Sequence, residues 1–134
     1  MEDIFEKIAR KEIPSEGVYE DEDVYAFLDI KPNNLGHTLV IPKKRYKNIY
    51  DAPAEVLQKM IVAAQKIALA QKKTLGAEGV NIVMNNESAA GQIVFHIHMH
   101  VIPRFKGDGF EHWHGTTRTE EEMKLTAEKI RACI

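Results

Sequence analysis

Three histidines fall within five residues of one segment, His96-Ile97-His98-Met99-His100. In an extended strand alternate side chains share a face, so we expect the three imidazoles to project together, roughly 6.6 Å apart at each step. The residues between them are apolar and should point into the core. A row of imidazoles costs stability if the rings are charged together or buried without partners, so the pattern indicates a chemical function.

Two chemistries fit this spacing. His-x-His on a strand is a common way to present imidazoles to zinc or iron. A neutral imidazole can also attack phosphorus while its neighbours position the phosphate. A straight strand separates His96 from His100 by roughly 13 Å, which is too far for one ion without a sharp twist. Spacing alone leaves metal binding and phosphate chemistry about equally supported.

The flanking residues favour phosphate chemistry. Residues 85–92 form a polar loop of small residues that ends in Gly91-Gln92. Backbone N–H groups in such a loop can approach a phosphate closely, and an amide such as that of Asn85 holds an anion without being a strong metal ligand. A fourth histidine, His37, stands at the start of an apolar strand. These residues therefore shift the balance from metal binding to phosphate chemistry, for which no cofactor is expected.

The elements that position these residues follow from hydrophobic spacing and turn residues. Strands are expected over residues 18–20, 24–30, 37–41, 80–84 and 93–102, with Pro42 and Pro103 ending two of them. Helices are expected over residues 3–11, from a cap at Asp51 with Pro53 in the first turn to a stop at Gly76, and from the capping box of Thr119 and Glu122 to Arg131. The sum is an α+β fold: a five-stranded antiparallel sheet with one main helix and smaller helices, in a single domain of residues 1–134.

Composition narrows the class of protein. The chain has 134 residues, of which 44% are hydrophobic and 28% charged, as in ordinary globular proteins. Its formal net charge of -2 provides no basic field for nucleic acid or for an anionic membrane. There is one cysteine, and neither a signal peptide nor an apolar run long enough to cross a bilayer is recognisable. A cytoplasmic location is expected.

Taken together, these segments resemble the histidine triad (HIT) superfamily, and within it the Hint-like branch of nucleoside phosphoramidases. The family pattern His-x-His-x-His-x-x, with apolar residues at x, stands at residues 96–102. Matching segments occur in the family's order at residues 3–14, 26–30, 36–42 and 91–92. The resemblance covers nearly the whole chain. It implies a homodimer whose two five-stranded sheets join into one ten-stranded sheet, and a reaction without a metal.

The resemblance also implies a reaction. Members of the branch hydrolyse purine nucleoside monophosphates from amine leaving groups through a nucleotidyl-histidine intermediate, as an adenosine 5'-monophosphoramidase does. His98 would attack the α-phosphate, and His100 would hydrogen-bond a phosphate oxygen. His96 would position the nucleophile through its backbone carbonyl, because such an acceptor fixes which ring nitrogen carries the proton. His37 would steady the triad.

Nucleotide-binding residues follow from the same resemblance. Asp29 would accept hydrogen bonds from both ribose hydroxyls. The apolar walls of the base pocket would be Phe5, Ile8, Phe27 and Ile30. The phosphate shelf would be Asn85, Gln92 and the backbone near Ile93. By periodicity alone the four apolar residues are better explained as core residues, and both roles can hold together.

Three features depart from the pattern of related enzymes. Ile93 stands where many Hint-like enzymes have a serine or threonine, so one phosphate contact is missing or is replaced by Ser88. The Cys-x-x-Cys zinc site of many bacterial members is replaced by Asp3 and Glu6, so no structural zinc is expected. The third triad position is His100 rather than glutamine, which favours hydrolysis over nucleotidyl transfer.

Two other functions remain open, and metal binding by the triad is a third. The Pro-Arg-Phe run at residues 103–105 is also found in the Fhit branch, whose members are dinucleoside polyphosphate hydrolases. A nucleotide-binding scaffold with weak catalysis, acting through its dimer surface, is the alternative from a different class. A second His-x-His at residues 112–114 is either a solvated surface or part of a C-terminal segment that sets substrate choice.

Overall fold

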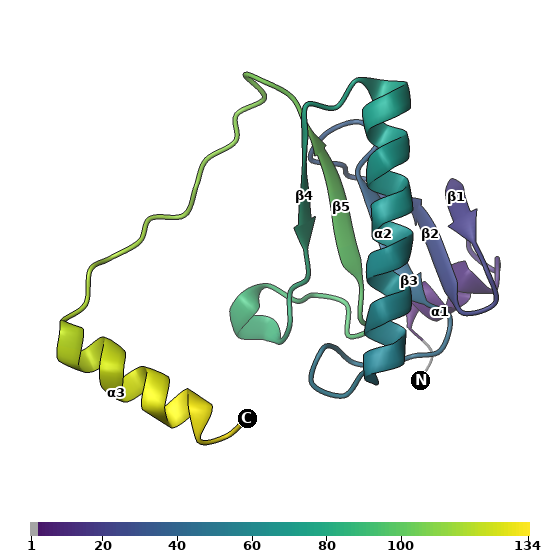
Figure 1. Ribbon diagram of the computed structural model, residues 1–134. Helices are drawn as coiled ribbons and strands as arrows, with labels where there is room; N and C mark the ends of the chain where they lie inside the picture. The colour runs from purple at the N-terminus through teal and green to yellow at the C-terminus, as the bar shows by residue number, and fades with distance from the viewer. Residues whose placement is uncertain (1–2) are drawn as a thin grey trace.

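The strands of the protein form one antiparallel sheet. The computed structural model describes residues 3–134. Its elements, in chain order, are α1 (Ile4–Ala9), β1 (Gly17–Glu20), β2 (Val24–Leu28), β3 (Thr38–Pro42), α2 (Ala54–Leu75), β4 (Gly79–Val83), the 3₁₀ turn η1 (Ser88–Ala90), β5 (Met99–Arg104) and α3 (Glu120–Arg131). The sheet has five strands in the order β1-β2-β3-β5-β4 (Figure 1). This arrangement confirms the expected α+β fold.

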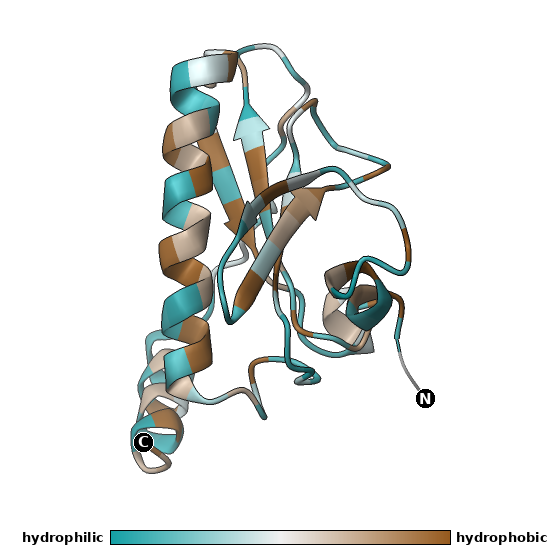
Figure 2. Ribbon diagram, turned by 90° about the vertical axis from the view of Figure 1, so that its right-hand side faces the viewer, coloured by the Kyte–Doolittle hydropathy of each residue, from teal (hydrophilic) through white to brown (hydrophobic). Residues whose placement is uncertain are grey.

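The sheet separates two apolar clusters. On one face, Met60 of α2 packs in a cluster that includes Val40 and Val101, together with the apolar residues that alternate with the triad histidines. On the other face, Phe5 and Ile8 of α1 pack against residues of β2 and β3. Figure 2 shows the long helix α2 and the short helix α1 on opposite sides of the sheet. The apolar residues of the triad therefore anchor it from the α2 side.

Of the two predicted ends of α2, only the C-terminal one is confirmed. Gly76 is the C-cap and has a φ of 69°, the left-handed conformation that favours glycine. The N-cap is Pro53, whose side chain has no hydrogen-bonding group. The prediction that Asp51 caps the helix is wrong. The carboxylate of Asp51 instead accepts the N–H groups of Lys47 and Asn48, because it closes the turn that precedes the helix.

The strand predicted over residues 93–102 is also wrong in its extent. β5 begins only at Met99, and it continues through Pro103 to Arg104. Pro103 does not end the strand, since β3 pairs with β5 no further than Val101 and the missing N–H costs no bond on that side. Residues 93–98 have no partner in the sheet, and the N–H of Ile97 donates to the carbonyl of Tyr46 at 2.7 Å instead.

The C-terminal part of the chain is extended. Between β5 and α3 there is neither helix nor strand, and α3 stands away from the body of the molecule (Figure 1). The capping box of Thr119 and Glu122 begins α3 as predicted, and none of its residues is buried. Within residues 3–134, every helix is too short or too polar to cross a bilayer.

Candidate active site

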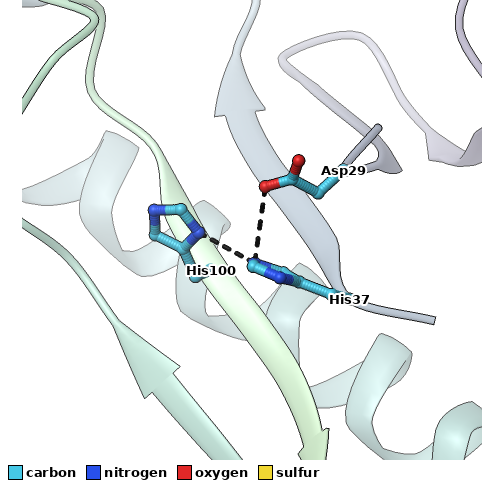
Figure 3. A group of neighbouring side chains, drawn as sticks. All are labelled: Asp29, His37 and His100. Atoms are coloured by element: carbon cyan, nitrogen blue, oxygen red, sulfur yellow. Dashed lines mark hydrogen bonds and ion pairs between the residues drawn. The ribbon is translucent and has the colours of Figure 1, made fainter. Parts of the chain in front are cut away.

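The sheet register brings Asp29, His37 and His100 to one end of the face that carries α1. Leu39 pairs with both Phe27 and His100. Alternate residues share a face. Asp29 is two residues from Phe27 and His37 is two residues from Leu39, so both project on the same side as His100. His37 Nε2 lies 2.9 Å from His100 Nδ1 and 3.7 Å from Asp29 Oδ2 (Figure 3).

One main-chain N–H assigns the proton positions of two of these rings. The N–H of Asn33 donates to His37 Nδ1 at 3.1 Å. A ring nitrogen that accepts a hydrogen bond carries no proton, so a neutral His37 has its proton on Nε2 and donates it to His100 Nδ1. The proton of a neutral His100 must then lie on its own Nε2. That nitrogen remains as a hydrogen-bond donor for a ligand.

Burial keeps this pair of rings neutral. It lowers the pKa of His37, and the nearby carboxylate of Asp29 opposes this only in part. Burial, followed by the neighbouring His98 and His37, lowers the pKa of His100 to about 4. Because both pKa values move downward, both rings are uncharged at neutral pH, which the chain of hydrogen bonds requires.

His98 has the complementary proton arrangement. Its Nδ1 lies 2.8 Å from the backbone carbonyl oxygen of His96. A carbonyl can only accept, so Nδ1 carries the proton and Nε2 of the neutral ring keeps its lone pair. Burial is the largest cause that lowers the pKa of His98, and only 7% of the residue is exposed. Its ring centroid lies 5.0 Å from that of Phe5 and 5.1 Å from that of His100.

The cluster of Asp29, His37 and His100 has ligand atoms within 4.8 Å of one another, a spacing that could hold a metal ion. The donor set does not fit one. A metal on His37 Nε2 would need the ring proton on Nδ1, where it would face the N–H of Asn33. The geometry of these residues fits a chain of hydrogen bonds better than a metal centre.

The residues predicted to line a base pocket divide into two groups. Phe5, Ile8 and Phe27 are buried together in the apolar cluster beside the histidines, where Phe5 and Phe27 meet edge to face at 5.7 Å. Ile30 lies beyond the end of β2 and is 91% exposed. The structure therefore brings three of the four together as core residues and leaves Ile30 on the surface.

Gln92, predicted to hold phosphate, is buried and already has four partners. Its side-chain oxygen accepts from the Asn48 side chain and from the N–H of Glu87, at 3.1 and 2.8 Å. Its amide nitrogen donates to the carbonyls of Lys47 and Val94, at 2.7 and 3.0 Å. The side chain thus fixes the loop before the triad, and it would have to break these bonds to contact a ligand directly.

Asn85 and Ile93 lie on either side of that loop. Asn85 is half-buried, and its amide nitrogen is 4.0 Å from the place where a Cβ on Gly91 would stand. Gly91 has a φ of 93°, which favours glycine at this turn. The side chain of Ile93 is 87% exposed and, being apolar, offers no hydrogen bond.

Sequence patterns did not point to two groups that organise the site. The N–H of Asn33 leaves no trace in residue type, because every residue except proline has one. The carboxylate of Asp3 reaches the ring of His96, at 3.0 Å from Nδ1. Asp3 and Glu6 form a capping box at the start of α1, whereas the contact of Asp3 with His96 joins residues far apart in the chain.

Four buried or half-buried histidines lie along one side of β3, from His37 before its first residue to His96 beside Pro42. This chain belongs to the histidine triad family. The HIT domain model matches residues 10–107. An uncharacterized HIT-like protein of Methanocaldococcus jannaschii is 53% identical over 106 residues, which cover 79% of this chain and 81% of that protein. A crystal structure of a HIT family member from Bacillus subtilis has a TM-score of 0.91 and 42% identity, covering 100% of this chain and 98% of that one.

Two further matches have functional names. Adenylylsulfatase HINT3 of Arabidopsis thaliana is 36% identical over 133 residues, which cover 98% of this chain and 66% of that protein. The crystal structure of a histidine triad nucleotide-binding protein from Candida albicans has a TM-score of 0.87 and 30% identity, covering 98% of this chain and 96% of that one. The family therefore includes nucleotide-binding proteins and hydrolases.

Proposed function

We propose that the protein hydrolyses the phosphorus–nitrogen bond between a purine nucleoside monophosphate and an amine, through a nucleotidyl-histidine intermediate on His98. The observation that carries this proposal is the pairing of two opposite proton arrangements. His98 Nε2 has a lone pair, while His100 Nε2 carries a proton, and the two ring centroids are 5.1 Å apart. A nucleophile and a hydrogen-bond donor thus stand side by side, as attack on a phosphoryl group requires.

The reaction proceeds in two displacements. His98 Nε2 attacks the α-phosphorus, the bond from phosphorus to the amine nitrogen breaks, and the amine leaves with a proton from solvent. The carbonyl of His96 stabilises the positive charge on the modified ring through Nδ1–H, and His100 Nε2–H donates to a phosphoryl oxygen. Water then attacks phosphorus, the bond to Nε2 breaks, the water releases a proton, and His98 returns to its neutral form.

Binding of the nucleoside is proposed at the end of β2. One carboxylate oxygen of Asp29 accepts the N–H of Lys31 at 2.8 Å, and the other faces His37, so the carboxylate is held beside the histidines. In that position it can accept hydrogen bonds from ribose hydroxyls. Ile30, next in the chain, offers an exposed apolar side chain that a purine ring can cover. The preference for purine rests on the family resemblance.

We also infer a homodimer in which β4 pairs with β4 of a second copy, so that the two sheets become one of ten strands. β4 is the last strand of the sheet. Its Val80 and Ile82 are 40% and 41% exposed, and the outer face of α2 exposes Ile61 and Leu69. An edge strand with exposed apolar side chains is normally covered by another element, and a second copy would cover it.

The decisive experiment replaces the nucleophile. Purified wild-type protein and His98→Asn are compared on an adenosine phosphoramidate, and the quenched reactions are analysed by mass spectrometry. We expect a loss of roughly 10⁴-fold or more, because the substitution removes the covalent route. A nucleotidyl adduct should be found on His98 in the wild type only. Unchanged turnover by His98→Asn would refute the assignment.

The same preparations separate the alternatives. Faster turnover of diadenosine tetraphosphate than of the phosphoramidate would favour a dinucleoside polyphosphate hydrolase. Tight binding of a purine monophosphate with negligible turnover of either compound would favour a nucleotide-binding scaffold.

A further inference from the structure

His96 has a set of partners unlike that of the other histidines of the site. Its ring is fully buried, with Nδ1 at 3.0 Å from Asp3 Oδ2 and Nε2 at 2.8 Å from the carbonyl oxygen of Pro42. Both neighbours are oxygen acceptors, so each ring nitrogen must donate and each must carry a proton. An imidazole with two protons is a cation, and this one is fully buried.

The carboxylate of Asp3 has the surroundings of an ionised group. Its Oδ1 accepts the N–H of Glu6 at 2.7 Å, where Asp3 is the N-cap of α1. Its Oδ2 lies 3.1 Å from Nε of Arg45, whose guanidinium also lies 3.8 Å from the carboxylate of Glu6. The N–H of Glu6, the ring of His96 and the positive charge of Arg45 thus surround the carboxylate of Asp3, as suits an anion. With the ring of His96, two positive and two negative groups form one electrically balanced cluster.

This charged cluster anchors residues 93–98, which form no hydrogen bonds of the sheet. Residues 93–98 have no strand partner, although they carry the nucleophile. Arg45 Nε donates to the carbonyl of Phe95 at 3.3 Å, and the carbonyl of Tyr46 accepts the N–H of Ile97 at 2.7 Å. His96 lies between these two anchors. Its ring is tied to Asp3, and its carbonyl accepts the Nδ1–H of His98.

We propose that Asp3 and Arg45 are positioning residues for the nucleophile, because they hold His96 as a buried cation whose carbonyl stays directed at His98. Within residues 3–134, the titratable groups around His96 are Asp3 at the N-cap of α1, Arg45 in the loop after β3 and His98 in its own segment. The cation also acts on His98 through space. Its positive charge adds to burial in lowering the pKa of His98 and so preserves the lone pair on Nε2.

The charge of His96 can be observed directly. Near neutral pH, imidazole ¹⁵N–¹H spectra of the wild type should show protons on both ring nitrogens of His96. Asp3→Asn keeps an oxygen acceptor and a residue that can cap α1, but it removes the negative charge, so one of these protons should be lost. Asp3→Glu keeps the charge and should restore the doubly protonated ring.

The kinetic part rests on the proposed function. In Asp3→Asn, kcat for the phosphoramidate should fall by up to about 100-fold, with KM little changed, because the nucleophile is less well oriented. The acid limb of the pH–rate profile should move to higher pH, since the neighbouring cation no longer lowers the pKa of His98. Arg45→Gln should act in the same direction with a smaller effect. Asp23→Asn breaks an exposed ion pair with Lys59 and is the matched control, with no expected effect on either measurement.

Two outcomes would overturn the proposal: a single proton on His96 of the wild type, or wild-type kcat and pH profile in Asp3→Asn. If the wild-type protein hydrolyses no phosphoramidate, the proposed function fails, while the spectra still decide the charge of His96.

Discussion

The chain contains two His-x-His runs with the same spacing and opposite surroundings. In the first, every ring is buried or half-buried, and the hydrogen bonds determine which nitrogen of His98 and His100 carries the proton. In the second, His112 and His114 are exposed on an extended segment on either side of Trp113, which is 98% exposed. His112 has a ring contact with Phe110 at 4.6 Å. The difference shows that main-chain acceptors and donors around a ring, rather than ring spacing, determine which ring nitrogen keeps its lone pair.

After His98→Asn, the largest expected effect is at His37. His37→Leu removes the donor that faces His100 Nδ1, so the proton of His100 can move to that nitrogen and leave the substrate without its donor. We expect kcat for the phosphoramidate to fall by about 100-fold. His37→Gln, whose amide can still donate, should retain more activity. Equal activity of both variants and the wild type would show that turnover does not depend on a donor from His37 to His100 Nδ1.

An intermediate effect is expected from pH. The pKa values of His37, His98 and His100 are lowered from 6.5, that of His100 to about 4. The folded state therefore binds these protons at a lower pH than the unfolded state. This contribution to stability is complete above about pH 6.5 and is lost as the pH falls toward 4. Melting temperatures measured across this range should fall, and less steeply in His100→Gln. If the melting temperature of His100→Gln fell with pH as steeply as that of the wild type, the lowered pKa of His100 would be contradicted.

The smallest effect is expected in the second run. The double substitution His112→Gln and His114→Gln changes only exposed rings, so it should alter the free energy of unfolding by less than about 0.5 kcal/mol. Turnover of the phosphoramidate should be unchanged. Urea unfolding and steady-state kinetics measure both quantities. A large loss of activity would mean that this segment reaches an active site, and the contrast between the two runs would then be wrong.

The sequence predicted elements whose cause is local and missed features whose cause is distant. The end of α2 at Gly76 and the capping box of α3 depend on residues within a few turns, and both are confirmed. The strand over residues 93–98 was predicted from alternation, but the alternation there reflects a loop held by Tyr46 and by the ring bonds of His96.

The candidate site was predictable in its residue types and not in its proton positions. The resemblance to the family pointed to Asp29, His37, His98 and His100, and the fold brings them close together. Which nitrogen carries each proton depends on the N–H of Asn33 and on a backbone carbonyl. These groups are present in almost every residue, so no pattern of side chains marks them.

The N–H of Asn33 has a consequence for protein engineering. Any substitution at this position except proline leaves the group in place, so side-chain changes at residue 33 preserve it as long as the loop keeps its path. The proton arrangement of the site is then a property of backbone shape. If the histidines were grafted onto another scaffold, this loop would have to be included. Without it, nothing would determine which ring nitrogen of His37 and His100 carries the proton.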